Sequence, residues 1–252
     1  MSAPRIAVIG GTGLDAMPGL ERLGEQALDT PWGAPSAPLL VGRFAGTEVA
    51  FLPRHGRAHG VPPHRINYRA NLWALHAAGV RTVIAVAAVG GIDARAEAGV
   101  IVVPDQIIDY TWGREHTYCD GSGAAVTHVD FTRPYGERGR AALLAAAAAE
   151  RIEVLDRGTY GAVQGPRLES AAEIDRMERD GCTIVGMTGM PEAGLARELD
   201  IDYACCALVA NRAAGRAAGP LTMDDIQATL ERGMARVLEL LAATLSRLSV
   251  TA

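Results

Sequence analysis

The sequence is poor in aromatic residues and cysteines. Aromatic residues make up 5% of the 252 residues, so aliphatic side chains, with heavy use of alanine, must build the core. The four cysteines form no Cys-x-x-Cys pair, and two of them, Cys205 and Cys206, are adjacent. Adjacent residues of a strand point to opposite faces, so we expect small buried thiols and no disulfide. This cysteine usage is typical of a reducing compartment, and we predict a cytoplasmic protein.

The sequence also has no long apolar run and no excess of positive charge. Its start lacks the basic segment and the longer apolar run of a signal peptide, and charges interrupt its Ala-rich segments. We therefore expect no membrane span. The formal net charge is −5, which disfavours binding to nucleic acids or to anionic membranes. An anion site in this chain must be a local pocket.

Signatures of two hydrolase classes are missing as well. The sequence contains no Gly-x-Ser-x-Gly motif, which argues against a serine hydrolase. None of its six histidines has the helical spacing of a zinc site; His55, His59 and His64 fall in a loop rich in glycine and proline. We predict no metal site.

What the sequence does contain is an alternation of strand and helix patterns in a length that fits one α/β domain. We expect strands at 5–9, 39–52 (a hairpin), 82–89, 100–108, 157–163, 182–187 and 203–209, and helices at 68–78, 138–150, 170–179, 192–199 and 222–246. The stretch 109–131 is irregular. A loop of that length in a compact domain is usually functional or lies at an interface.

A glycine-rich turn, Gly10-Gly11-Thr12-Gly13, follows the first strand. With Ala16 it fits the dinucleotide fingerprint Gly-x-Gly-x-x-Gly/Ala, but Met17-Pro18-Gly19 interrupts the required helix and a hairpin replaces the βαβ unit. Backbone N–H groups of glycines can still approach an anion closely, and Thr12 adds a hydroxyl donor. A nucleotide-binding protein without chemistry remains an alternative.

Two further segments carry polar donors. Arg54, His55, Arg57 and His59 share one loop, which is either a solvated surface loop or part of an anion site. Thr188 stands between a strand and a helix. Its turn is either a plain connection or a second wall of an anion or ribose site at the carboxyl edge of the sheet.

Five ordered motifs together resemble one family. They are Ile9-Gly10-Gly11-Thr12-Gly13-Leu14, Arg54-His55-Gly56, Asn67-Tyr68-Arg69-Ala70-Asn71, Gly165-Pro166-Arg167 and Met187-Thr188-x-Met190-Pro191-Glu192. The set is similar to the trimeric purine nucleoside phosphorylase and methylthioadenosine phosphorylase family and covers nearly the whole chain. The resemblance implies one α/β domain over residues 1–252, with a twisted, mixed, partly barrel-like central sheet flanked by helices. It also implies a homotrimer with active sites at the subunit interfaces, inorganic phosphate as a substrate, and no metal or organic cofactor.

The resemblance further implies roles for individual residues. Phosphate would be held by Thr12, Arg54, His55, the backbone at Ala88, and Thr188. Met187 would lie under the ribose, Leu168 would pack against the base where the family usually has Phe, and His128 would reach the 5′ end of a neighbouring subunit's nucleoside. Ala87 departs from the polar residue of the methylthioadenosine branch.

The base pocket separates the branches of the family. Adenine-specific members resemble Thr-Asp-Tyr-Asp where this chain has Ala210-Asn211-Arg212-Ala213, and the 6-oxopurine branch has Asn there and Glu at the position of Glu169. Hypoxanthine offers an N1–H donor to a carboxylate, and its O6 and N7 accept from an amide. Glu169 could also be an ordinary acidic residue at a helix N-terminus. Beside Asn211, it predicts a 6-oxopurine site, with Asn211, Glu169 and His55 as the catalytic residues.

The 5′ end of the site indicates a different substituent from that of ordinary nucleosides. Nucleoside phosphorylases resemble one another in a His near the last helix that meets the 5′-hydroxyl; this chain has no His after His128, and has Leu221, Met223 and Ile226 there. An apolar lining suits a methylthio group and would leave a hydroxyl unpaired, although the same residues fit helix packing. We therefore predict phosphorolysis of 5′-methylthioinosine. Methylthioadenosine phosphorylase, inosine/guanosine phosphorylase and a water-using nucleosidase remain alternatives.

Overall fold

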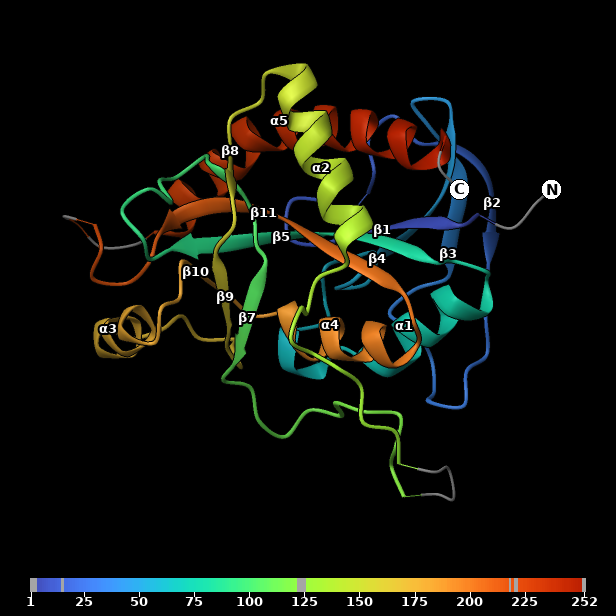
Figure 1. Cartoon of the computed structure of the whole chain (residues 1–252), viewed down its shortest axis with the longest axis horizontal. Helices are drawn as coiled ribbons and strands as arrows, with labels where there is room; N and C mark the ends of the chain where they lie inside the picture. Colours follow the sequence, from blue (N-terminus) through green and yellow to red (C-terminus); the bar gives the residue numbers. More distant parts are fainter. Residues whose placement is uncertain (1–3, 15, 122–125, 218, 220–221, 251–252) are drawn as a thin grey trace.

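The computed structural model describes residues 4–14, 16–121, 126–217, 219 and 222–250 (Figure 1). Its strands are β1 (Ile6–Gly10), β2 (Glu21–Gln26), β3 (Leu39–Phe44), β4 (Thr47–Pro53), β5 (Thr82–Gly91), β6 (Ile101–Val103), β7 (Gln106–Asp109), β8 (Val154–Asp156), β9 (Thr159–Ala162), β10 (Ile184–Gly186) and β11 (Asp202–Arg212). Its helices are α1 (Tyr68–Ala77), α2 (Glu137–Glu150), α3 (Ala171–Arg179), α4 (Gly189–Glu198) and α5 (Met223–Val250), with a short 3₁₀ turn at Pro63–Arg65.

The described strands form one mixed sheet with β5 at its centre. The main path runs β2-β3-β4-β1-β5-β10-β9-β7, while β11 pairs with β5 and β6, and β6 pairs with β8. On β5, the neighbours β1 and β11 run parallel and β10 runs antiparallel. The expected α/β architecture, a mixed central sheet flanked by helices, is confirmed.

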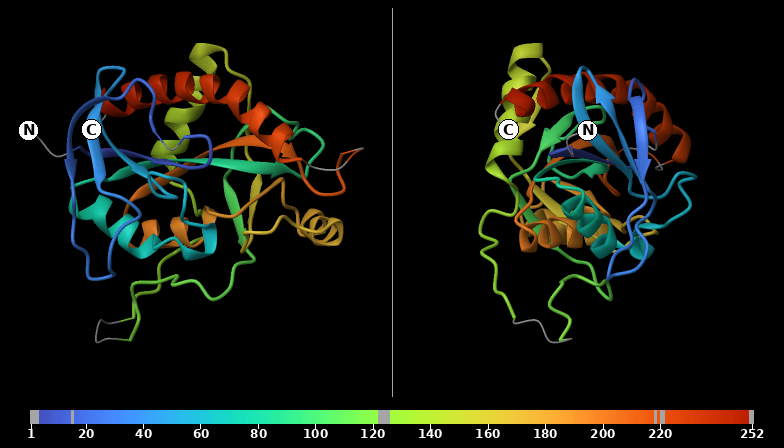
Figure 2. Two further views of the ribbon diagram at one scale, coloured as in Figure 1. Left: turned by 180° about the vertical axis from the view of Figure 1, so that it is seen from behind. Right: turned by 90° about the vertical axis from the view of Figure 1, so that its right-hand side faces the viewer.

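Helices cover both faces of this sheet. The long helix α5 and α2 lie over one face, and α1 and α4 lie over the other (Figures 1 and 2). Alternate residues of β1 supply the two cores: Ala7 and Ile9 pack in the cluster that includes α1 and α4, whereas Ile6 and Val8 pack in the cluster of α2 and α5. A strand buried on both faces reads as a continuous apolar run, which is why β1 and β5 were predictable.

Three strand predictions need correction. The stretch 100–108 is two strands, because Pro104 offers no N–H and Asp105 turns away to accept a hydrogen bond from the Gly158 nitrogen (3.0 Å). β2 and β8 were missed, since their residues are exposed or half-buried and show no apolar alternation. Among the described residues, no helix is long and apolar enough to cross a membrane.

The strand directions bring distant turns together. β1 lies parallel to β4 with Gly10 opposite Pro53, so the glycine turn and the Arg54 loop leave the sheet side by side. The Arg54 nitrogen donates to the Gly10 carbonyl (3.0 Å). β11 runs parallel to β5 through a bulge between Val209 and Asn211, which places Asn211 opposite Gly90. The polar segments therefore meet at one edge of the sheet.

Candidate active site

A cavity of about 410 Å³ opens at this edge. Its lining includes every residue predicted to hold phosphate, namely Thr12, Arg54, His55, Ala88 and Thr188. These residues come from the turn after β1, the loop after β4, the strand β5 and the turn between β10 and α4. The structure thus brings together four segments that are distant in sequence.

The same cavity is lined by most residues predicted to contact the nucleoside. They are Leu168, Glu169, Met187, Asn211, Met223 and Ile226. They come from the segment between β9 and α3, the end of β10, the end of β11 and the start of α5. His128 is not among the lining residues; it is exposed in the segment 126–131, outside the sheet. Ala87 lines the cavity beside Ala88 and brings no polar group to it.

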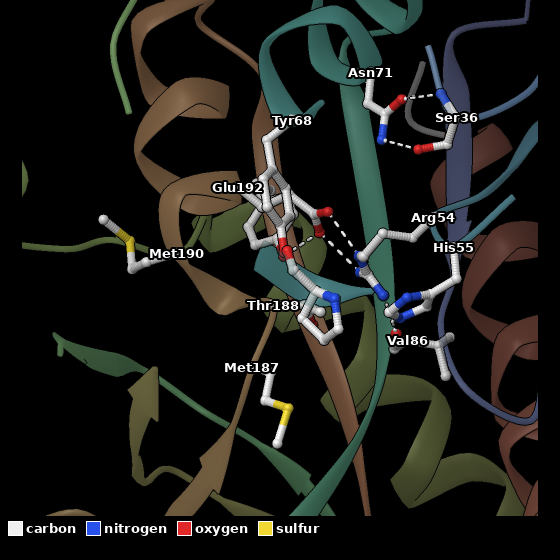
Figure 3. Close-up of polar contacts among 12 residues, drawn as sticks. Ser36, Arg54, His55, Tyr68, Asn71, Val86, Met187, Thr188, Met190 and Glu192 are labelled. Atoms are coloured by element: carbon white, nitrogen blue, oxygen red, sulfur yellow. Dashed lines mark hydrogen bonds and ion pairs between the residues drawn. The ribbon is translucent and has the colours of Figure 1, made fainter. Parts of the chain in front are cut away.

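The deepest charged group at the cavity is Arg54, which is 1% exposed. Its Nε and Nη2 donate to the carboxylate of Glu192 (2.7 and 2.8 Å), and its Nη1 donates to the Val86 carbonyl (3.0 Å) (Figure 3). Burial alone would lower the pKa of Arg54, but the Glu192 carboxylate outweighs it and holds that pKa above its ordinary value. Tyr203 donates to the same carboxylate (2.8 Å). The guanidinium is therefore fixed, charged and aimed by a buried network.

One imidazole, that of His55, lies next to Arg54, and a second, that of His59, lies next to His55. His55 packs beside the guanidinium (Figure 3), and its Nδ1 donates to the Val61 carbonyl at 2.9 Å, which sets the proton on that nitrogen. The His59 ring lies 4.5 Å from the His55 ring, centroid to centroid, and its Nε2 is 3.5 Å from the hydroxyl of Thr12. Thr12, His55 and His59 form one polar wall around the space next to Arg54.

Thr188 closes the other side of this space. It is 8% exposed, and its backbone nitrogen donates to the Tyr160 hydroxyl (3.4 Å). Tyr160 fits across the turn because Gly186 and Gly189 have no Cβ: a Cβ at Gly186 would lie 2.1 Å from the Tyr160 oxygen. Gly189 and Met190 follow Thr188, and Met190 has non-helical backbone angles (φ −119°, ψ 142°), so the regular part of α4 begins after this turn.

Glu169 and Asn211 line the cavity from two different elements. Burial raises the pKa of Glu169 above its ordinary value. Asn211 is half-buried, and its Nδ2 donates to the Arg212 carbonyl (2.8 Å). An amide nitrogen carries two N–H groups, so one remains for a ligand. A carboxylate acceptor and an amide donor at one cavity can recognise the edge of a 6-oxopurine.

The last part of the lining is apolar. Met223, 69% exposed, and Ile226 lie in the first turn of α5. The Thr222 hydroxyl accepts from the Asp225 nitrogen (3.2 Å), a capping contact that fixes this turn, and it donates to the Asp225 carboxylate (2.6 Å). Leu221 lies outside the described residues.

The sequence patterns did not reveal the buried residues whose hydrogen bonds orient the groups that line the cavity. Glu192, fully buried, was noticed only as part of a Pro-Glu motif, and Tyr160 and Tyr203 only as parts of strands. Glu192 lies 138 residues after Arg54, so no local sequence pattern indicated that the two side chains pair. Among the described residues, no group of three or more His, Cys, Asp or Glu side chains could hold a metal ion.

Comparisons with known proteins agree with this geometry. The pattern of the family described as the Phosphorylase superfamily matches residues 5–246. A Pseudomonas syringae pv. tomato protein named "Probable S-methyl-5'-thioinosine phosphorylase" is 52% identical over 240 residues, covering 95% of this chain and 98% of that protein. The 6-oxopurine nucleoside phosphorylase of Pyrococcus furiosus is 42% identical over 247 residues, covering 96% and 92%. The methylthioadenosine phosphorylase of Schistosoma mansoni, solved with adenine, superposes with a TM-score of 0.94 at 30% identity, covering 98% and 92%.

Proposed function

The chain belongs to the Phosphorylase superfamily, and we propose that it cleaves S-methyl-5′-thioinosine with inorganic phosphate. It is an enzyme of the purine nucleoside phosphorylase type, a pentosyltransferase. The products would be hypoxanthine and 5-methylthio-α-D-ribose 1-phosphate. The observation that carries the proposal is one cavity lined by Glu169, Asn211 and the apolar pair Met223 and Ile226.

Phosphate binding is assigned to the space next to Arg54, between Thr12 and His55 on one side and Thr188 on the other. Arg54, His55, Thr12 and Thr188 would surround the anion, with the backbone at Ala88 as a further contact. Arg54 already forms an ion pair with Glu192, so its charge alone would not hold the phosphate. Hydrogen bonds from the other residues around the anion would contribute to its binding. We propose that phosphate is a co-substrate and that no metal or organic cofactor takes part.

The nucleoside would occupy the rest of the cavity. Leu168 would pack against the base, and Met187 would lie under the ribose. The Glu169 carboxylate would accept from N1–H, while the remaining Asn211 N–H would donate to N7 or O6. A methylthio group would meet Met223 and Ile226, which offer no hydrogen bond to a hydroxyl.

The chemistry would be a displacement at the anomeric carbon. As the C1′–N9 bond breaks, the ribose gains oxocarbenium character and the purine gains negative charge. A phosphate oxygen held near Arg54 and His55 forms the new C1′–O bond and stabilises the cationic sugar. Asn211 donates to the leaving base most strongly as its charge develops, which lowers the barrier.

Two wider features belong to the proposal. The chain would work as a cytoplasmic homotrimer, with His128 of one subunit reaching the 5′ end of the nucleoside bound by another. The exposed position of His128, away from its own cavity, supports this arrangement.

A second candidate is a general 6-oxopurine nucleoside phosphorylase, which the 42% identical relative supports. Methylthioadenosine phosphorylase is a third candidate, favoured by the fold similarity alone. A nucleosidase would use water in place of phosphate, and a binding protein would show no turnover.

The first test measures purine release from methylthioinosine, methylthioadenosine and inosine, each with and without phosphate. We expect fast, phosphate-dependent cleavage of methylthioinosine. Preference for inosine would show that Met223 and Ile226 are ordinary packing residues, and preference for methylthioadenosine would contradict the base pocket.

Substitution of one base-pocket residue tests the assignment separately. Asn211→Asp should shift preference toward 6-aminopurines, because a carboxylate accepts from the exocyclic amine and repels O6. The inosine-to-adenosine ratio of kcat/KM measures the shift. An unchanged ratio would show that Asn211 does not contact the base.

A further inference from the structure

Arg114 is a buried arginine outside the cavity that the proposed function does not use. It lies in the irregular segment after β7 and is 8% exposed. Its guanidinium has five N–H groups and makes six hydrogen-bond contacts, so one N–H of Nη1 is shared between two acceptors. The acceptors are the Gln164 side chain (3.1 Å), the Tyr68 hydroxyl (3.3 Å), and the backbone carbonyls of Met187 (2.9 Å), Met190 (2.6 Å), Val163 (3.1 Å) and Gln164 (2.8 Å).

Four of these acceptors are main-chain carbonyls in two separate segments. Val163 and Gln164 begin the segment that continues through Leu168 and Glu169 to α3, the base wall of the cavity. Met187 precedes Thr188 in the turn after β10, and Met190 follows it at the start of α4 (Figure 3). One guanidinium therefore joins the segment assigned to the base with the segment assigned to ribose and phosphate.

The planar shape of the side chain matters for this arrangement. Nη2 donates into the first segment and Nη1 into the second, while Nε secures the Gln164 side chain. Arginine presents its N–H groups in a rigid fork, which lysine cannot imitate. All six hydrogen bonds go to neutral oxygens, so the geometry of the fork, and not an ion pair, accounts for these contacts. The Arg114 guanidinium also lies 5.5 Å from the Tyr68 ring centroid.

We propose that Arg114 is a positioning residue that fixes the spacing between the base wall and the ribose–phosphate wall. It touches neither reactant. It acts on Glu169 and Thr188 through the backbone of the segments that carry them, and in this respect the inference rests on the proposed function. A misplacement of about 1 Å in such a wall can cost roughly 100-fold in rate.

The first measurement is hydrogen–deuterium exchange of the whole protein, which needs no substrate. Arg114→Met removes every donor while keeping an apolar stem. We expect faster exchange in peptides covering 164–169 and 187–190, and no change in β1. Arg43→Met, at an exposed arginine whose ion pair with Glu48 spans 3.8 Å, is the matched control and should leave both segments unchanged.

Kinetics with methylthioinosine provide the second readout. We expect kcat/KM to fall about 10- to 100-fold in Arg114→Met, with a raised KM for the nucleoside and a smaller change in the KM for phosphate, because Arg54, His55 and Thr12 do not contact Arg114. Arg114→Lys should recover only part of the loss. A purely structural role would lower the fraction of active enzyme and leave both KM values unchanged.

Gln164→Leu keeps the test valid if Arg114→Met does not fold. Gln164 accepts from Arg114 Nε and from the Trp112 nitrogen (3.3 Å), so its loss should speed exchange in the same peptides to a smaller extent. Unchanged exchange in both segments, or KM values equal to those of the wild type, would overturn the proposal. Faster exchange in a protein whose wild type fails to cleave methylthioinosine would support the positioning role and reject the proposed substrate.

Discussion

At the scale of single residues, the buried pair of Arg54 and Glu192 decides how the site presents positive charge. Both side chains are within 1% of full burial, and the pair has two hydrogen bonds of 2.7 and 2.8 Å. Taking one partner from such a pair leaves the other as an uncompensated charge. The phosphate assignment therefore depends on a carboxylate that does not line the cavity.

We predict that Glu192→Gln weakens both folding and phosphate use. Removing one partner of a buried ion pair costs about 3–5 kcal/mol, so the midpoint of urea unfolding should fall. The KM for phosphate should rise more than the KM for the nucleoside, because Arg54 loses its fixed orientation. Phosphate titrations at saturating nucleoside measure this.

The exposed pair of Glu25 and Arg57 supplies the control for that substitution. Its side chains are 43% and 53% exposed and pair at 2.5 Å, so Glu25→Gln should cost at most about 1 kcal/mol. Equal phosphate KM values in wild type and Glu192→Gln would contradict the role of Arg54.

Glu169 makes a prediction about pH. Burial raises the pKa of its carboxyl, so protonation begins at a higher pH than for an exposed glutamate. The carboxylate accepts from N1–H of hypoxanthine, whereas the protonated form donates to N1 of adenine. As pH falls below neutrality, the ratio of kcat/KM for methylthioinosine over methylthioadenosine should therefore fall.

Taking the ratio of kcat/KM for the two substrates cancels every pH effect that the two reactions share, including the titration of phosphate. The glutamine in Glu169→Gln does not titrate, so in this variant the ratio of kcat/KM for methylthioinosine over methylthioadenosine should stay constant over the same pH range. A falling ratio in the variant, or a flat ratio in the wild type, would show that Glu169 does not meet N1.

At the scale of elements, the sequence predicted the regular parts of the fold well. Apolar runs located β1 and β5, and helical spacing located α1, predicted at 68–78 and found at 68–77. The failures have physical causes. β2 is an edge strand whose residues are exposed or half-buried, and its existence depends on pairing with β3, which a local pattern does not record.

The candidate site divides in the same way. Most residues predicted to meet a ligand belong to motifs or lie beside them, and the structure gathers all of those predicted except His128 at one cavity. Arg114 and Tyr160 act on backbone atoms of Met187 and Thr188. Backbone N–H and C=O groups have no residue signature, so no spacing rule in the sequence could reveal these contacts.

The turn after β10 allows a prediction about packing, because Gly186 leaves no room there for a side chain. A Cβ on Gly186 would lie 2.1 Å from the Tyr160 oxygen and 2.7 Å from its Cζ, and Tyr160 is fully buried. Gly186→Ala should therefore destabilise the protein by about 1–3 kcal/mol and lower kcat/KM, since Met187 and Thr188 follow directly.

Gly24 offers the matched control, because a Cβ there has no atom within 4 Å. Gly24→Ala should change the thermal midpoint little, and calorimetry of both variants compares them. Similar midpoints would mean that the turn relaxes around the added methyl group.

At the scale of the whole molecule, the segment 109–131 stands out because the contacts within one chain account for only part of its course. Its described residues extend from the sheet past α1 and α4 (Figures 1 and 2). Arg114, near its start, is anchored behind the active site, whereas Val126, further along, is 70% exposed. In the proposed trimer, this segment would link the site of one subunit to the surface that a neighbour covers.

A trimer with shared sites makes a prediction that a monomer does not. His128→Ala and Asn211→Ala should each lose most activity with methylthioinosine, for different halves of the site. In a cyclic trimer the His128→Ala chain keeps a complete base pocket, and an Asn211→Ala neighbour supplies the missing imidazole. Mixing the two inactive proteins under conditions that exchange subunits should restore about a quarter of the sites, the fraction expected for random assembly in a cyclic oligomer.

The control for this experiment mixes Asn211→Ala with Glu169→Ala. Both substitutions fall in the same base pocket, so no mixed trimer contains a complete site contributed by two chains and no activity should return. Light scattering of each protein should give a mass near three times 26.4 kDa. Recovery in the control would show that Glu169 and Asn211 of one chain do not serve the same site. No recovery in the first mixture despite proven exchange would place His128 outside its neighbour's site and leave each chain with a self-contained cavity.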